Sequence, residues 1–163
     1  MLQQTTVRAP TTGHEPAPMR LLESMTRACD SLRPAFQLAT RGYVSWQFLK
    51  SGWLKVTNWP GTLDLFREEY HVPVLSPHAA AVSGAFAELF LPVLITLGIG
   101  GRVGPAGLFV FNVMAVVSYR QVLLAEGAEA ALAQHVLWGF MLATLVVFGN
   151  GPWSLDRLFR RRP

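Results

Sequence analysis

The sequence contains little cysteine and little charge, and each shortage excludes a class of protein. Cys29 is the only cysteine among 163 residues, so the chain cannot form an internal disulfide, a Cys-x-x-Cys redox pair, a zinc ribbon or an iron–sulfur cluster. Charged residues make up 15% of the chain, against about 25% in a soluble globular domain. That is too few to cover the surface of a soluble globule of this size.

What is abundant instead is apolar sequence, with basic residues gathered at the two ends. Apolar residues make up 51% of the chain and its mean hydropathy is +0.31. The formal net charge is +4, but the arginines and lysines form no continuous face or stripe, which argues against nucleic-acid binding. Residues 1–20 hold three prolines and no apolar run, so they do not have the pattern of a signal peptide.

Long apolar stretches predict membrane-spanning helices, because a span needs about 20 mostly apolar residues. Three stretches meet this requirement: 79–99, which carries the single charge of Glu88, then 103–119 and 132–149. A fourth stretch, 36–57, is interrupted by Arg41, Lys50 and Lys55. We include it because an even number of spans puts both arginine-rich ends on one side of the membrane.

The distribution of arginine and lysine predicts which side that is. Four arginines precede the first predicted span and four follow the last: Arg8, Arg20, Arg27 and Arg33, then Arg157, Arg160, Arg161 and Arg162. The connections at 58–78 and 120–133 hold one arginine each. Since excess Lys and Arg marks the cytoplasmic side, we predict an all-α fold, a four-helix transmembrane bundle with both termini in the cytoplasm.

The regions outside the spans divide into short segments. Residues 1–19 are rich in Pro and Thr and predict a disordered tail. Residues 20–35 have apolar residues at helical spacing and predict an amphipathic surface helix that ends at Pro34; a short helix packed on the bundle fits equally well. The membrane domain is expected over 36–159, with a short outer helix near 62–70, and a basic tail over 160–163.

Glu88 is the first candidate site residue, because a charged group inside a span costs about 2.5–3.5 kcal/mol. It predicts a salt bridge that fixes two helices, a proton-handling or ligand-binding carboxylate, or a protonated acid exposed to lipid. Arg41 and Lys55 share one face of the first span, and Arg41 is the expected partner of Glu88. Lys50, on the opposite face, is a weaker partner that can snorkel. The surplus of cations would suit an anionic ligand or a lipid headgroup.

His135 opens the fourth predicted span and completes an intramembrane polar site of Arg41, Lys50, Lys55, Glu88 and His135. A lone histidine is more often a hydrogen-bonded structural residue than a metal ligand. No second histidine lies in a span, which excludes a bis-histidine haem. His71, His78 and His135 could meet at the outer surface and bind copper or zinc, although their spacing does not require it. At the inner face, we expect a charge cluster in which Asp156 pairs with Arg41 or Arg102.

Four sequence segments together resemble the DoxX family of small bacterial membrane proteins: ATRGYVSWQFLKSGWLKV, AELFLPVLITLGIGGR, HVLWGFMLA and GPWSLDRLF. The residues that carry the resemblance are Arg41, Gly52, Lys55, Glu88, Arg102, His135, Pro152, Ser154 and Asp156. It extends over about residues 36–159, and Pro92 departs from it by standing where many relatives have glycine.

The resemblance implies a multi-pass protein of the bacterial inner membrane. It also implies a redox-associated subunit that links thiol, sulfur or oxidative-stress chemistry to the quinone pool together with partner proteins. Quinone is the cofactor that the resemblance allows, since the sequence has no haem or iron–sulfur ligand set. The first connection resembles a branch found beside enzymes that make copper-binding peptides, so the alternative is a non-enzymatic protein of copper or small-solute homeostasis.

Overall fold

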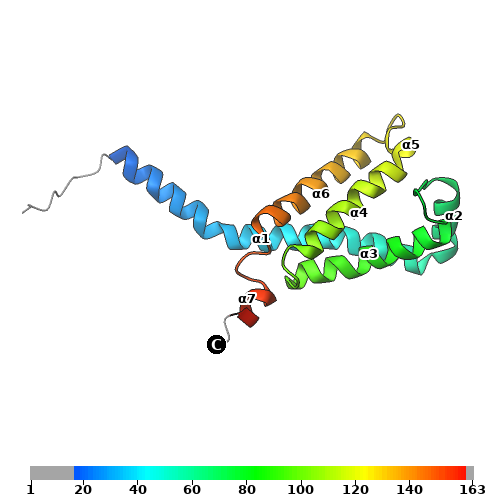
Figure 1. Ribbon diagram of the computed structural model, residues 1–163. Helices are drawn as coiled ribbons and strands as arrows, with labels where there is room; N and C mark the ends of the chain where they lie inside the picture. The colour runs from blue at the N-terminus through cyan, green and yellow to red at the C-terminus, as the bar shows by residue number, and fades with distance from the viewer. Residues whose placement is uncertain (1–16, 161–163) are drawn as a thin grey trace, which may run out of the picture. The chain divides into compact units, whose positions relative to one another are not determined.

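The computed structural model describes residues 17–160, and every regular element in that range is a helix (Figure 1). The all-α prediction is therefore confirmed for this range. The helices are α1 (Ala17–Thr57), α2 (Trp59–Glu68), α3 (Pro77–Leu97), α4 (Val103–Ser118), α5 (Arg120–Leu123), α6 (Glu129–Phe148) and α7 (Leu155–Arg160). Most of the predicted N-terminal tail, residues 1–16, and residues 161–163 of the basic tail lie outside the described range.

Helix α1 contains Pro34 in its interior, so the prediction that this proline ends a helix is wrong. A proline ring removes one backbone hydrogen bond, but its φ near −65° fits an α-helix, and the helix continues on both sides.

The contacts between residues divide the chain into two compact units, and the first unit ends at Leu32. In the first unit the side chains of residues 18–32 are all exposed, and Glu23 and Arg27 form an ion pair of 3.8 Å one turn apart.

In the second unit, the helices coincide with the apolar stretches of the sequence. Among the described residues, α3 and α6 are long and apolar enough to cross a membrane, and α4 is apolar but has only 16 residues. Helix α1 does not meet the same criterion; its second half carries Arg41, Lys50 and Lys55 and several uncharged polar residues. The short outer helix expected near 62–70 is present as α2, shifted toward the N-terminus.

One apolar core joins four of these helices. It is formed by buried residues from α1, α3, α4 and α6: Val44, Phe48, Ile95, Leu108, Leu142 and Leu145. Helix α4 packs against both α3 and α6 (Figure 1). Burial of such large side chains contributes about 1.5–3 kcal/mol each in water; between lipid-embedded helices, close packing takes over much of this role.

Gly52 sets the distance between α1 and α3. A Cβ atom on Gly52 would lie 3.0 Å from Glu88 Cβ and 3.1 Å from the backbone carbonyl carbon of Glu88. No side chain fits at that separation, so glycine allows the two helix backbones to approach closely. The approach also brings Ser51 and Lys55, which flank Gly52 on α1, next to Glu88.

Candidate functional site

Glu88 on α3 forms an ion pair with Lys55 on α1. Lys55 Nζ lies 2.7 Å from Glu88 Oε2 and 3.0 Å from Oε1. The side chains retain only 12% and 8% of their exposure. Ser51 completes the cluster, since its hydroxyl accepts from Lys55 Nζ at 2.9 Å and donates to Glu88 Oε1 at 3.2 Å. The carboxylate is therefore paired and hydrogen-bonded, as a charge withdrawn from water must be.

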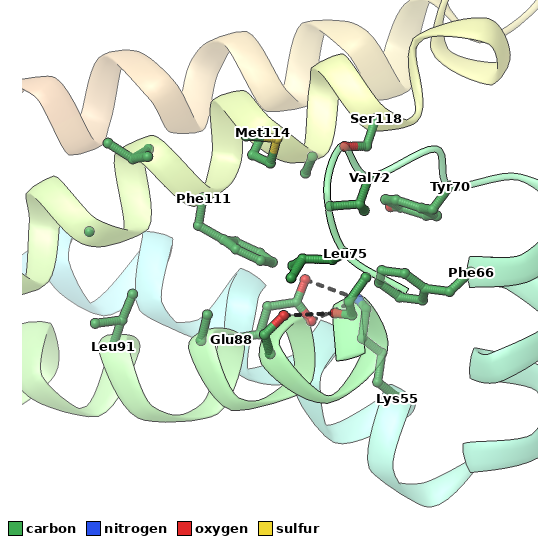
Figure 2. Close-up of a pocket in the computed structure, with 16 residues that line it drawn as sticks. Lys55, Phe66, Tyr70, Val72, Leu75, Glu88, Leu91, Phe111, Met114 and Ser118 are labelled. Atoms are coloured by element: carbon green, nitrogen blue, oxygen red, sulfur yellow. Dashed lines mark hydrogen bonds and ion pairs between the residues drawn. The ribbon is translucent and has the colours of Figure 1, made fainter. Parts of the chain in front are cut away.

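The ion pair lines a largely apolar pocket of about 350 Å³. Figure 2 shows Lys55 and Glu88 joined on one side of it, with Phe111 and Met114 of α4 across from them. Helices α3 and α4 supply most of the wall, and Lys55 of α1, Phe66 of α2 and the segment after α2 supply the rest. An apolar cavity with a few polar groups is the usual form of a small-molecule site.

The part of the pocket wall formed by residues 69–72 is tied to the end of α4. The backbone N–H of His71 donates to the carbonyl of Ser118 at 3.0 Å, and the Tyr119 hydroxyl donates to Glu69 Oε2 at 2.6 Å. The rings of Tyr70 and Tyr119 stack with centroids 4.5 Å apart. Burial, and then the hydrogen bond to Glu69, raise the pKa of Tyr119 to about 12. Tyr119 therefore stays protonated and keeps donating at neutral pH.

Ser118 provides a second polar group on the pocket wall. Its side chain lines the pocket near Val72 and Tyr70 (Figure 2). The residue is only 3% exposed, and its hydroxyl oxygen has no hydrogen-bond partner among the described residues. An unpaired buried hydroxyl costs about 1–3 kcal/mol, so Ser118 is a position where a bound molecule could supply the missing partner.

The expected pair between Glu88 and Arg41 is wrong. The Arg41 guanidinium instead donates to four backbone carbonyls, those of Ile95 and Thr96 at the end of α3 and those of Asn150 and Trp153 after α6. Arg41 is 14 residues before Lys55, about 21 Å along α1 at 1.5 Å per residue. It therefore meets the C-terminal end of α3, where a cation is favoured by the helix dipole, and not the level of Glu88.

Asp156 also binds backbone rather than a cation. Its carboxylate accepts from the N–H groups of Gly100 and Gly101 at 3.2 and 2.6 Å. Arg102 donates to the carbonyl of Val147 at 3.2 Å. Among the described residues neither Arg41 nor Arg102 forms an ion pair with Asp156. Asp156 thus fixes the α3–α4 turn and Arg102 contacts the end of α6, and the expected charge pair is not formed.

His135 is held by Asn112 and lies apart from the ion pair's hydrogen-bond network. Its Nδ1 lies 2.9 Å from Asn112 Oδ1, and Asn112 Nδ2 donates to the carbonyl of His135 at 3.0 Å. Because the amide nitrogen is fixed on that carbonyl, Asn112 Oδ1 faces Nδ1 as an acceptor, and Nδ1 carries the proton. The structural interpretation of His135 as a hydrogen-bonded helix contact is the one this geometry supports.

The other predicted residues do not join a common site. Lys50 is exposed between Trp46 and Trp53 and makes no hydrogen bond or ion pair with any described residue. Within residues 17–160 no three His, Cys, Asp or Glu side chains gather around a metal-sized space, so His71, His78 and His135 do not meet there. The residues predicted to form one intramembrane polar site therefore separate into the Lys55–Glu88 pair, the Arg41 contacts with backbone carbonyls, the His135–Asn112 contact and Lys50.

Sequence reasoning missed Ser51, Asn112 and Ser118 as site residues. Ser51 and Lys55 are four residues apart, which is about one helical turn. This spacing alone predicts that the Ser51 hydroxyl lies beside the Lys55 ammonium. Asn112 is the only amide side chain in the stretch 103–118, and a polar residue in an apolar span is a signal of interhelical hydrogen bonding. Ser118 has no such signal, because it stands at the end of its stretch.

Comparison with known proteins gives one match. Neither the curated proteins nor the solved structures include a match to the chain. The model of the DoxX family matches residues 36–121 of the 163, a range that includes Arg41, Lys55 and Glu88 and ends before His135. With this match and the apolar helices α3 and α6, the chain belongs to the DoxX family of membrane proteins.

Proposed function

We propose that the second half of α1 and the helices α3, α4 and α6 cross the bacterial inner membrane, with both termini in the cytoplasm. The core shared by these four helices supports this arrangement. The excess of arginine before residue 36 and after α6 supports the cytoplasmic position of both termini. A reporter fused at residue 126, between α5 and α6, should give a periplasmic signal, and one fused after residue 160 a cytoplasmic signal. A cytoplasmic signal at residue 126 would contradict the topology.

We further propose that the protein is a redox-associated membrane subunit that binds quinone in the pocket between α3 and α4 and works with partner proteins. The observation that carries the proposal is the buried Lys55–Glu88 pair on the wall of a largely apolar cavity in a DoxX chain. A quinone ring with an apolar tail needs this combination of apolar surface and a few polar groups.

The residues present fit such a ring. Phe111, Met114 and Leu91 supply apolar and aromatic surface for its faces, and the unpartnered hydroxyl of Ser118 supplies a hydrogen bond. Most of the residues that line the pocket belong to α3 and α4, and an apolar tail would lie along these helices. When bound, quinone supplies two-electron, two-proton carrier chemistry. The chain's own part is to position the ring and to exclude water from it.

Quinone retention tests this proposal. The protein is purified from its native membranes in mild detergent, extracted with organic solvent and assayed for quinone by mass spectrometry. Ala115→Phe fills the pocket from α4 and should reduce the quinone recovered per protein at least tenfold. Val113→Phe, an exposed position of the same helix that does not line the pocket, is the matched control. Equal recovery from both variants, or none from the wild type, would overturn the assignment.

A further inference from the structure

A second pocket lies beside the guanidinium of Arg41. It has a volume of about 440 Å³ and is formed by Leu38 and Arg41 of α1, the end of α3 and residues 152–158. It shares no lining residue with the pocket around Lys55 and Glu88. Two of its lining side chains, Arg41 and Arg157, are cationic, and none of its lining residues is acidic. The pocket therefore presents positive charge to whatever occupies it.

Arg41 carries its charge in a buried position and keeps one unused donor. The residue is only 2% exposed, and a guanidinium has five N–H groups. Nε donates to the carbonyl of Ile95, Nη1 to those of Asn150 and Trp153, and Nη2 to that of Thr96. One N–H on Nη2 remains. Carbonyl dipoles and the end of α3 offset only part of a full charge, so an anion would complete the pairing.

The acidic side chain of this segment is used elsewhere. Asp156 accepts from the backbone N–H groups of Gly100 and Gly101, and it does not line the pocket. Arg157, the next residue, is exposed and does line it. Neither Arg41 nor Arg157 forms an ion pair with a described carboxylate. The two cations of the pocket thus have no counter-charge from residues 17–160.

The rim of the pocket is apolar and open. Leu38, Leu97, Trp153 and Leu158 all line it and are between 41% and 58% exposed. Tryptophan and arginine are the side chains that gather where a membrane meets water. The proposed topology places this pocket at the cytoplasmic ends of α1 and α3. An anionic group joined to apolar chains matches both the buried charge and the rim.

We infer that this pocket binds the phosphodiester headgroup of an anionic phospholipid from the cytoplasmic leaflet. The inference is independent of the quinone proposal and rests only on the proposed membrane arrangement. A phosphate oxygen accepts the remaining N–H of Arg41, and Arg157 contributes a second cation from the surface. Guanidinium groups suit phosphate because their hydrogen bonds to it are charge-assisted. The acyl chains then contact Leu38 and Leu97.

The test uses Trp153 as a reporter inside the pocket. The full-length protein is reconstituted in phosphatidylcholine vesicles that contain a minor fraction of either brominated phosphatidylglycerol or brominated phosphatidylcholine. Bromine quenches nearby tryptophan, and the difference between the wild type and Trp153→Phe isolates the signal of Trp153. This substitution leaves in place the backbone carbonyl that Arg41 uses. We expect the anionic lipid to associate about tenfold more strongly than the neutral one, as one charge-assisted hydrogen bond provides.

Two variants connect this preference to the pocket. Thr96→Glu adds a carboxylate to the pocket wall and keeps the backbone carbonyl that Arg41 contacts, so the preference should disappear. Arg157→Gln should lower it about fivefold, as expected for one surface cation near anionic lipid. Arg102→Gln is the matched control, because Arg102 is exposed and belongs to the same side in the proposed topology but does not line the pocket. It should change the preference less than twofold.

Each contrary result has its own meaning. Equal association of the two lipids with the wild type would overturn the inference. Equal losses in Arg157→Gln and Arg102→Gln would also overturn it, because they indicate general attraction to a charged surface. The third arm adds glycerol 3-phosphate or a short-chain phosphatidylglycerol as competitor. Equal competition by both would show that the pocket takes a free phosphate and not a lipid. A cytoplasmic reporter signal at residue 126, with the lipid preference intact, would overturn the assigned leaflet and the topology but keep the lipid site.

Discussion

Lys55 Nζ lies 2.7 Å from Glu88 Oε2, with both side chains almost withdrawn from the surface. Breaking one partner of a buried pair leaves the other charge unpaired and typically costs about 3–5 kcal/mol. Lys55→Met and Glu88→Gln should each lower the free energy of unfolding by about this amount. The double change should cost less than the sum of the two by more than about 1 kcal/mol. Thermal unfolding in detergent measures all three.

Lys50→Met is the control for this cycle. Lys50 lies on the same helix, is exposed, and has no hydrogen-bond or ion-pair partner among the described residues. Substitutions at such sites usually change stability by no more than about 0.5 kcal/mol. Strict additivity of Lys55→Met and Glu88→Gln would show that the two charges do not depend on each other, contrary to the structure.

Gly52→Ala should destabilise the protein through the contact between α1 and α3. The new methyl would lie 3.0 Å from Glu88 Cβ and 3.1 Å from the Glu88 carbonyl carbon. These Glu88 atoms belong to the helix itself and cannot rotate away as the end of a flexible side chain can. The two helices must therefore move apart, and overpacking of this kind costs about 1–3 kcal/mol. Gly42→Ala on the same helix has nothing within 4 Å of its methyl. It should be neutral or stabilise by up to about 1 kcal/mol, because alanine favours helix. Equal effects of the two changes on the melting temperature would contradict the proposed close approach.

The helices were predictable because the apolar stretches that form them are long and carry few charges. The stretch 79–99 predicted α3 within two residues at each end, and the interruption of 36–57 by three cations still left a helix. The face shared by Arg41 and Lys55 was also predictable from helical periodicity. Helical periodicity does not predict how far α3 is shifted along the axis of α1. This shift determines whether Glu88 lies beside Arg41 or beside Lys55, and it depends on the close packing at Gly52.

The surroundings of Arg41 and Asp156 were harder to predict for a different reason. Sequence reasoning matches charges with charges, whereas Arg41 and Asp156 are satisfied by backbone groups. Helix ends leave carbonyl and N–H groups without partners inside the helix, and the sequence does not reveal which side chain will reach them. The pocket was not predictable either, since it depends on how α2 and residues 69–76 fold back over α3 and α4.

The contact between Tyr119 and Glu69 should give the stability of the protein a defined dependence on pH. Its ordinary pKa is about 10, and burial together with Glu69 raises it to about 12 in the folded protein. Because the folded pKa is the higher one, the contribution of Tyr119 is complete below pH 10 and declines as pH rises from 10 through 12. Tyr119→Phe should melt below the wild type at pH 8, and the difference should shrink across that window. A difference that stays constant from pH 8 to 12 would show that the hydroxyl is not the group responsible.

Arg41→Gln should cost more than about 3 kcal/mol, because the guanidinium donates to four carbonyls and hydrogen bonds from charged groups contribute about 1.5–3 kcal/mol each. Arg41→Lys should recover only part of the loss, since an ammonium keeps the charge at the end of α3 but has three donors in a compact group. Trp153 provides a local signal, because its carbonyl is one of the four acceptors. Its fluorescence should shift in Arg41→Gln before the protein unfolds.

The same variant also distinguishes the two possible partners of Glu88. Arg41 and Glu88 share no hydrogen bond or ion pair in the structure, and effects of distant, unconnected residues usually add within about 0.3–0.5 kcal/mol. The combination of Arg41→Gln with Glu88→Gln should therefore cost the sum of the single changes, whereas the combination of Lys55→Met with Glu88→Gln should not. A coupling above about 1 kcal/mol between Arg41 and Glu88 would mean that the guanidinium leaves its carbonyls and reaches the carboxylate. Because the two cycles share Glu88→Gln, any general weakening of α3 by that change cancels between them.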